Sequence, residues 1–175
     1  GVYGLQEKLV WVHENEALRG WDGPSNNEWS NQPTSFVLHR LGELEMEAHC
    51  TPGHTPGHMT FIGEGVVISG DCMFLGRCGR TDLFGGDANA QRQSLVHLRA
   101  RLNGLPNDWL VLPGHLYQLA DGTNPTYITV EKLLTNNEAL AALDDDKEWN
   151  SLEFLAFDDD LAEKARRERV RAQRE

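Results

Sequence analysis

The sequence has few cysteines, few basic residues and no long apolar segment. Three cysteines occur among 175 residues, an odd and small number that argues against a disulfide framework and predicts reduced thiols in a cytoplasmic protein. No run of 18 apolar residues occurs, so the sequence predicts no transmembrane helix. The net charge of −11 argues against nucleic acid or an anionic membrane as partner, because phosphate binding needs a basic surface.

The informative feature that is present is a set of three strand-like segments, each ending in a turn that carries His or Asp. Residues 43–50 lead into residues 51–58, TPGHTPGH. Residues 66–69 lead into Gly70-Asp71, and residues 109–112 lead into PGH, ending at His115. Strand ends joined by tight turns are where a rigid scaffold aims ligand side chains into one cleft.

The ordered set PGHTPGH, SGD and PGH resembles the metallo-β-lactamase superfamily, in particular its glyoxalase II and persulfide dioxygenase branch. Supporting motifs are CGRTD at 78–82, GDA at 86–88 and Leu116-Tyr117. The resemblance covers roughly residues 5 to 140. It implies an α/β fold, the αββα metallo-β-lactamase-like sandwich, over residues 1–143. Residues 144–175, acidic and then basic, would form an extra C-terminal helical segment.

The signature His-x-His-x-Asp-His, which supplies most metal ligands in this superfamily, does not occur in the sequence. Residues 3–9 resemble the helix that follows that motif, and residues 10–14 resemble the next strand. We therefore expect the chain to correspond to the C-terminal part of such an enzyme. A sandwich without its N-terminal cover would expose an apolar face or a strand edge, which favours pairing with another chain, including a homo-oligomer.

The resemblance implies a metal site built from His54, Asp71 and His115. His54 and Asp71 would be the catalytic ligands, with Asp71 bridging two ions and His115 on the second ion. His58 would orient a ligand through a hydrogen bond. The alternatives are local hydrogen bonds of the turn histidines and a helix N-cap at Asp71.

Arg80 and Tyr117 occupy the places that contact the substrate in glyoxalase II. Arginine suits a carboxylate through a two-pronged charged hydrogen bond. The alternative is that Arg80 pairs with Asp82 or Asp87 to brace its loop. Five further residues have no place in the pattern and are expected to be surface or packing residues: His13, His39, His97, Arg99 and Arg101.

The expected activity is metal-dependent hydrolysis of a thioester such as an acyl-glutathione by metal-activated hydroxide, with two divalent ions, preferably Zn. The first alternative is a persulfide dioxygenase with one Fe(II) acting on glutathione persulfide. The second is a non-catalytic remnant or partner module. In the first two cases the partner is a small thiol-derived substrate.

Other segments have expectations of their own. We expect a turn-rich loop at 20–34, a helix over 89–102 stopped by Asn103-Gly104, and a helical region over 128–143. Cys50 and Cys72 are expected to be buried, and the glutamates at 43–47 to form a solvated face. The aspartates at 144–146 and 158–160 are expected in turns or at helix N-termini, and an exposed or frayed basic helix is expected from Leu161.

Overall fold

The computed structural model describes residues 10–18 and 27–173. Residues 3–9, predicted to be helical, lie outside the described part. The elements are β1 Trp11–His13, α1 Glu14–Leu18, β2 Asn27–Trp29, β3 Phe36–Leu41, β4 Leu44–Cys50, β5 Met59–Gly63, β6 Val66–Gly70, α2 Ala88–Leu102, β7 Leu110–Pro113, β8 Ile128–Thr129, α3 Val130–Asn136, α4 Glu138–Ala141, η2 Ala142–Asp144, α5 Asp146–Asn150, η3 Glu153–Leu155 and α6 Asp160–Ala172.

A six-stranded mixed sheet in the order β3-β4-β5-β6-β7-β8 forms the centre of the fold. Strands β3 to β6 pair antiparallel, β6 and β7 pair parallel, and β8 returns antiparallel to β7. The β5–β6 hairpin turns at Glu64 and Gly65, and both residues have positive φ. A two-residue turn with this backbone conformation matches the right-handed twist of the strands that it joins. The strands predicted at the three motif-bearing segments are thereby confirmed.

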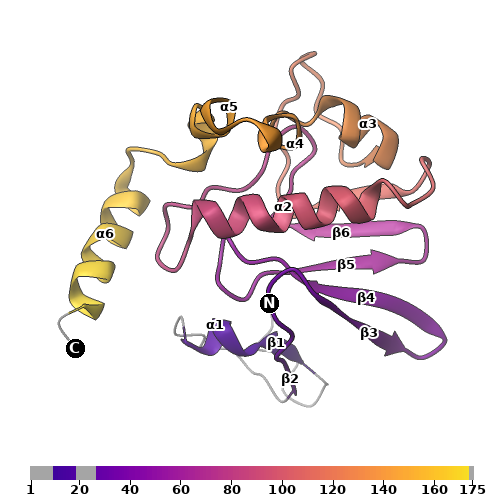
Figure 1. Cartoon of the computed structure of the whole chain (residues 1–175), viewed down its shortest axis with the longest axis horizontal. Coiled ribbons are helices and arrows are strands. Elements are labelled where there is room, and N and C mark those ends of the chain that lie inside the picture. The colour runs from indigo at the N-terminus through magenta and orange to yellow at the C-terminus, as the bar shows by residue number, and fades with distance from the viewer. Residues whose placement is uncertain (1–9, 19–26, 174–175) are drawn as a thin grey trace.

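Helices cover one face of this sheet. Figure 1 shows α2 lying along the sheet, with α3, α4 and α5 beside it and α6 projecting away from the body. Asp87 caps α2 by accepting from the Ala90 N–H, which satisfies a donor that the first helical turn leaves free. Leu95, Leu98 and Leu102 face the sheet and are fully buried, so the helix predicted over 89–102 is confirmed.

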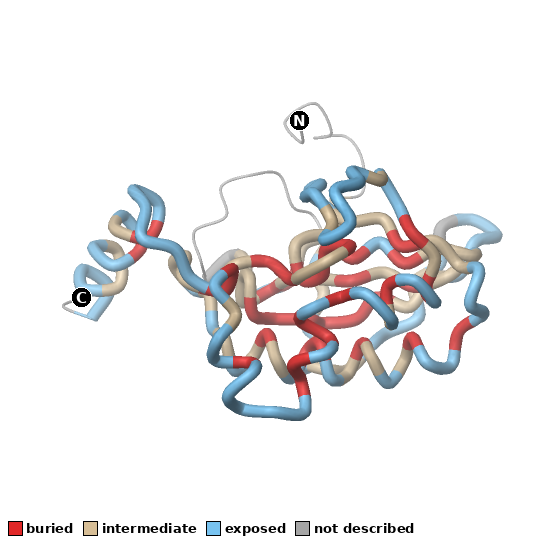
Figure 2. Tube along the Cα trace, turned by 90° about the horizontal axis from the view of Figure 1, so that it is seen from above, coloured by how far each residue is buried: buried red, intermediate tan, exposed pale blue. Residues whose placement is uncertain are grey.

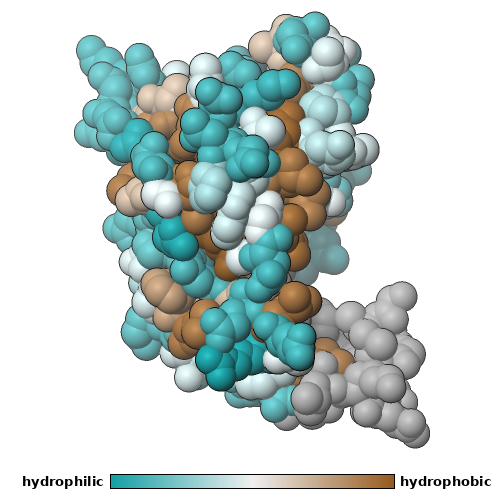
Figure 3. Space-filling model, turned by 90° about the vertical axis from the view of Figure 1, so that its right-hand side faces the viewer, coloured by the Kyte–Doolittle hydropathy of each residue, from teal (hydrophilic) through white to brown (hydrophobic). Residues whose placement is uncertain are grey.

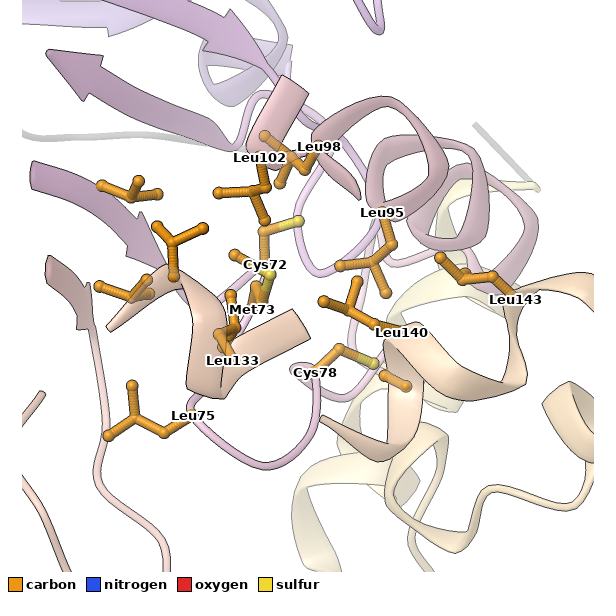
Figure 4. Close-up of a cluster of buried hydrophobic side chains, with 14 of the residues drawn as sticks. Cys72, Met73, Leu75, Cys78, Leu95, Leu98, Leu102, Leu133, Leu140 and Leu143 are labelled. Carbon is orange, nitrogen blue, oxygen red and sulfur yellow. The ribbon is translucent and has the colours of Figure 1, made fainter. Parts of the chain in front are cut away.

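The hydrophobic core lies between the sheet and these helices. In Figure 2 the buried residues run through the middle of the molecule, whereas α6 is largely exposed or half-buried. Figure 4 shows the side chains of Cys72 and Cys78 among leucines of α2, α3 and α4. Trp149, Phe154 and Leu155 join the same buried cluster, so part of the segment beyond residue 143 packs into this core.

Three expectations need correction. The loop predicted at 20–34 contains β2, which pairs parallel with β1. The helical region predicted over 128–143 begins as β8, because Ile128 pairs with Val111 of β7. It is then divided at Asn137, whose side chain accepts from the Leu140 N–H and starts α4.

The acidic runs behave as expected. Asp145 accepts from the N–H groups of Lys147 and Glu148 and caps α5, and Asp159 accepts from the Ala162 N–H and caps α6. Helix α6 is regular and not frayed over Asp160–Ala172, and it buries Ala162 and Ala165. Within the described residues, no helix has the length and apolar character needed to cross a membrane.

Strands β3 and β4 expose large apolar side chains. Phe36, Val37, Leu38 and Leu44 each have more than a third of their surface accessible. Viewed from the side of the hairpin turns, hydrophobic atoms lie in patches between hydrophilic ones (Figure 3). This exposure agrees with the apolar sheet surface that the sequence predicted.

Candidate metal centre and adjoining cavities

His54 lies in the loop between β4 and β5 with a defined orientation. Its Nδ1 is 2.8 Å from the backbone carbonyl of Arg80. A carbonyl only accepts, so Nδ1 carries the proton, and a neutral His54 presents a bare Nε2. That Nε2 lies 3.3 Å from Oδ2 of Asp71. Two lone pairs facing each other at this distance are favourable only with a proton or a metal cation between them.

Asp71 and His115 meet because β6 and β7 are parallel neighbours. Gly70 pairs with Pro113 at the ends of these strands, so the residues that follow emerge on the same edge of the sheet. Nε2 of His115 lies 3.3 Å from the same Oδ2 of Asp71 that His54 approaches. One carboxylate oxygen therefore faces two imidazoles carried by two different loops, and the three predicted ligands converge.

Glycines of the motifs make this close approach possible. A Cβ at Gly114 would lie 2.3 Å from Oδ1 of Asp71, and a Cβ at Gly79 would overlap the backbone carbonyl of Asp71. Gly70 has a φ of +51°, and a Cβ there would lie 2.6 Å from Nε2 of His58. The glycines beside the ligands are thus required by packing around the carboxylate as well as by turn geometry.

His58 supports Asp71 through the backbone. Its Nε2 accepts from the N–H groups of Asp71 at 3.0 Å and Cys72 at 3.2 Å. The proton is therefore on Nδ1, which lies 2.9 Å from the hydroxyl oxygen of Thr51 and donates to it. Burial lowers the pKa of His58 to about 4, so the ring is neutral, as this pattern requires. His58 orients the main chain that carries Asp71 and does not contact the carboxylate in these hydrogen bonds.

The electrostatics keep Asp71 ionised. Burial by itself raises the pKa of this carboxyl, but the three imidazoles around it, His54 first, outweigh burial and lower the pKa below its ordinary value. An ionised carboxylate between two imidazoles is the donor set that divalent zinc or iron prefers.

The pairwise spacing also fits a metal. Two ligands bound at about 2.0–2.1 Å to one tetrahedral ion lie about 3.3–3.4 Å apart. The His54–Asp71 and Asp71–His115 contacts match that separation. Among the described residues, however, no three His, Cys, Asp or Glu side chains form a group that could hold an ion alone. His54 and His115 would each supply a metal ligand beside Asp71, and further donors would be needed to complete the coordination.

The sequence matches the model of a known protein family. The model of the metallo-beta-lactamase superfamily matches residues 7–115. The chain belongs to this superfamily. The αββα fold expected from the motifs is therefore confirmed, and the chain adds C-terminal helices to it.

Two curated relatives have hydrolase names. The probable metallo-hydrolase YqgX of Bacillus subtilis is 35% identical over 120 residues, covering 61% of this chain and 56% of that protein. The hydroxyacylglutathione hydrolase of Tolumonas auensis is 46% identical over 116 residues, covering 66% of this chain and 38% of that protein. The chain thus matches little more than half of one relative and less than half of the other.

Two solved structures share the fold. ETHE1 from Myxococcus xanthus superposes with a TM-score of 0.61 at 22% identity, covering 91% of this chain and 64% of that one. TTHA1623 in a di-iron-bound form superposes with a TM-score of 0.53 at 25% identity, covering 78% of this chain and 70% of that one. The ETHE1 likeness is evidence for the fold alone.

In this protein the guanidinium of Arg80 is hydrogen-bonded to two carboxylates. Its guanidinium donates to Asp82 at 2.6 and 2.8 Å and to Asp159 at 2.7 and 2.9 Å. The guanidinium also lies over the ring of Phe157, and these carboxylates raise its pKa further above the ordinary value. The bracing alternative holds for Asp82 but not for Asp87, which caps α2. The substrate role of Arg80 stays a prediction.

Tyr117 follows His115 and is exposed at 41%. Its ring contacts that of Phe74, with centroids 4.9 Å apart, and the guanidinium of Arg77 lies 3.6 Å from its centroid. Phe74 in turn lies edge-on to His115. A row of rings therefore connects the candidate metal centre to Arg77, a residue that the sequence motifs did not single out.

The candidate ligands open into a cavity of about 290 Å³. Its wall combines the motif residues His54, Asp71, Arg80, His115 and Tyr117 with residues that sequence reasoning missed. Three of these apolar residues come from the C-terminal segment, namely Phe154, Phe157 and Leu161. Their sequence neighbourhood is strongly acidic, which masked their role as a wall of the cleft.

A separate polar cluster lies away from this cavity. His49, fully buried, is bonded to Glu47 on one side and His97 on the other, each at 2.8 Å, and Arg101 forms two hydrogen bonds with Glu47. Glu47 is therefore not part of a solvated face, contrary to the expectation for residues 43–47. The reason is that α2 packs over β4 and brings His97 and Arg101 to it.

The other residues without a place in the motifs are structural. Buried His13 bonds the carbonyl of Asn31 and the N–H of Asn15. His39 contacts the rings of Trp11 and Trp29. Arg99 pairs with Asp144. The cysteines are free and buried, as predicted for Cys50 and Cys72.

Proposed function

We propose that the protein is a metal-dependent hydrolase that cleaves a thioester such as an acyl-glutathione. The observation that carries the proposal is the approach of His54 and His115 to one oxygen of Asp71, each at 3.3 Å. The hydroxyacylglutathione hydrolase name of a relative that is 46% identical over 116 residues supports the substrate class. Because the chain covers 38% of that relative, the activity is proposed for the protein together with whatever donors complete the site.

His54, Asp71 and His115 would hold two divalent ions, Zn in the first instance. Such ions make a hydroxide nucleophile available near neutral pH and polarise the carbonyl that it attacks. The di-iron form of TTHA1623 supports a two-ion site of this fold and makes iron the alternative metal.

The chain's own residues orient these ligands. The Arg80 carbonyl holds the proton of His54 on Nδ1, which directs Nε2 toward Asp71. His58 fixes the backbone of Asp71, because its Nε2 accepts a hydrogen bond from the Asp71 N–H. Phe157 and Leu161 line the cavity from the C-terminal side and would exclude water from the reacting thioester, which strengthens electrostatic interactions there.

A persulfide dioxygenase with one Fe(II) is the second candidate. The CGRTD segment at 78–82 and GDA at 86–88 favour it. In that reaction His54 and Asp71 would supply two of the three iron ligands. A third candidate, a partner module without catalysis, is consistent with the lack of a complete three-residue ligand group among the described residues.

Elemental analysis of the protein purified without chelator separates these candidates. About two ions per chain, mainly Zn, with loss of thioester absorbance on a hydroxyacyl-glutathione would support the hydrolase. About one Fe with O₂ uptake on glutathione persulfide would replace it by the dioxygenase. Neither metal nor turnover would mean that this chain does not complete the site alone, so that the missing donors come from elsewhere or the chain is the partner module. We also place the protein in the cytoplasm, on the basis of its three buried free thiols.

Asp71→Asn tests the site itself. The amide keeps the size of the side chain but cannot bridge two cations, so activity and metal content should both be lost while the circular dichroism spectrum is retained. Asp108→Asn is the matched control, because Asp108 is exposed in the turn before β7. Full metal content in Asp71→Asn would refute the assignment of Asp71 as the shared ligand.

A further inference from the structure

The loop of residues 78–83 lies directly against two of the candidate metal ligands. The backbone carbonyl of its Arg80 accepts the hydrogen bond from Nδ1 of His54 at 2.8 Å. A Cβ at Gly79 would lie 3.2 Å from the same Nδ1 and would overlap the backbone carbonyl of Asp71. The main chain of this loop therefore sets the position that the His54 ring can occupy, and a shift of the loop would move the ring or break its hydrogen bond.

The C-terminal segment holds this loop in place. The N–H and the hydroxyl of Thr81 both donate to the carbonyl of Leu155, at 2.7 and 3.1 Å. The Phe157 N–H donates to Oδ2 of Asp82 at 2.7 Å. Arg169 of α6 donates to the backbone carbonyl of Asp82 at 3.0 Å. The segment thus binds both the main chain and a side chain of the loop.

Asp159 connects the start of α6 to Arg80. Its two oxygens accept from Nη1 and Nη2 of Arg80 at 2.7 and 2.9 Å, which is a two-pronged charged pair. The hydrogen bond from Arg80 lowers the pKa of Asp159 well below its ordinary value, so the carboxylate is charged near neutral pH. The same Oδ1 accepts the Ala162 N–H and caps α6. One carboxylate therefore joins this helix to the residue whose carbonyl meets His54.

The pair with Asp159 restrains the loop in a way that the pair with Asp82 cannot. Asp82 lies two residues from Arg80 in the same loop, so their pair fixes the internal shape of the loop. Asp159 follows Leu155, which belongs to the buried core. A pair to this segment fixes where the loop lies relative to the core, and that position decides the distance between the Arg80 carbonyl and His54.

We propose that Asp159 is a positioning residue for His54 and acts through the side chain and main chain of Arg80. Its carboxylate keeps loop 78–83 in place, so the Arg80 carbonyl stays within hydrogen-bond distance of Nδ1. Nε2 of His54 then stays directed at Asp71. Groups that hold a histidine ligand through its second nitrogen set the orientation and basicity of that ligand. The inference rests on the proposed function only for the role of His54 as a metal ligand.

Solvent exchange of the Nδ1 proton of His54 tests this coupling without metal or substrate. The side chain of His54 is 15% exposed and its Nδ1–H is hydrogen-bonded, so the proton should give an exchange-protected NMR signal that is absent in His54→Gln. Asp159→Asn retains an N-cap residue but removes the charge and one acceptor of the pair. Exchange at fixed pH should become about three- to thirtyfold faster, the effect of losing a partly exposed charged hydrogen-bonded pair.

Asp145→Asn is the matched control. Asp145 caps α5 by accepting from the N–H groups of Lys147 and Glu148, so the same change is made at the start of another C-terminal helix. It should leave the exchange rate of the His54 proton within about twofold of that of the unchanged protein.

Two further variants separate positioning from a general loss of structure. Arg80→Gln removes the guanidinium and keeps both the carbonyl and the α6 cap, so it should speed exchange as Asp159→Asn does, and it decides the matter alone if Asp159→Asn does not fold. Adding Asp159→Asn to Arg80→Gln should change the rate by less than about twofold further, because the two residues act as one unit. Asp159→Glu keeps the carboxylate and should restore slow exchange in part.

Equal exchange in Asp159→Asn and the unchanged protein overturns the proposal, as does equal exchange in Arg80→Gln. The same holds if Asp145→Asn speeds exchange equally, if the effects of Arg80→Gln and Asp159→Asn are additive, if Asp159→Glu exchanges as fast as Asp159→Asn, or if the unchanged protein shows no protected proton. A zinc affinity that His54→Gln leaves unchanged would refute His54 as a metal ligand, and the coupling of Asp159 to His54 would stand.

Discussion

Gly114→Ala separates the geometry of the metal centre from the stability of the fold. The substitution adds one methyl group next to Asp71, and that Cβ would lie 2.3 Å from Oδ1 and 3.1 Å from the backbone carbon of Gly70. Ordinary contact begins at about 3.4 Å, so the carboxylate must move by about 1 Å. Metal–ligand distances tolerate about 0.2 Å, and the displacement is several times larger.

The expected loss falls mainly on metal affinity. A displaced shared ligand should weaken zinc binding by about 10–100-fold or more, the range measured when groups that orient a ligand are removed. Stability should change little, because the Asp71 side chain is 25% exposed and can turn toward solvent. Overpacking of about 1 kcal/mol corresponds to a fall in Tm of about 2–4 °C for a chain of this length.

The assay is a competition titration of zinc against a chromophoric chelator, run beside thermal unfolding. Gly104→Ala is the control, because a Cβ at Gly104 meets nothing closer than 3.5 Å. It should leave zinc binding unchanged and alter stability by less than about 1 kcal/mol. Zinc binding by Gly114→Ala within threefold of the unchanged protein would refute the reasoning that Gly114 makes room for Asp71.

Three further predictions concern charges and thiols. Asp159→Asn keeps the N-cap of α6 but removes one of the two carboxylates on Arg80, so Tm should fall in low salt and the difference should shrink in high salt; a difference independent of salt would contradict it. Burial lowers the pKa of His49, so below pH 6.5 the unfolded chain binds more protons and stability falls with decreasing pH. His49→Gln should flatten the dependence of Tm on pH between 5 and 6.5, above the range where Glu47 titrates, and an unchanged slope would exclude this origin. The three cysteines should resist a thiol reagent at pH 8 until the protein unfolds, because burial raises the pKa of each, to about 11 for Cys50 and about 12 for Cys72; rapid labelling of the native protein would show an accessible thiol.

The strand ends and the candidate metal ligands that follow them were predictable from the sequence. Apolar or alternating segments ending in Gly-rich turns indicated β4, β6 and β7, and the structure brings His54, Asp71 and His115 to one place. These signals are local, because a turn that needs glycine and a strand that needs apolar residues are both encoded within a few positions.

The charge partners were not predictable in the same way. Arg80 was expected to bind substrate or to pair with Asp82 or Asp87, and its second partner is Asp159, 79 residues away in the sequence. Glu47 was expected in solvent and lies in a buried cluster with His49. Long, flexible charged side chains find partners through packing of distant elements, which leaves no periodic pattern in the sequence.

By itself, the sequence determined the superfamily, the strand ends and the identity of three candidate ligands, because backbone turns and buried strands depend on neighbouring residues. Only the tertiary structure decided that Arg80 is neutralised by carboxylates and that the C-terminal segment walls the cavity. Those outcomes depend on which long-range contacts desolvate and compensate each charge, and such contacts exist only once the chain has folded.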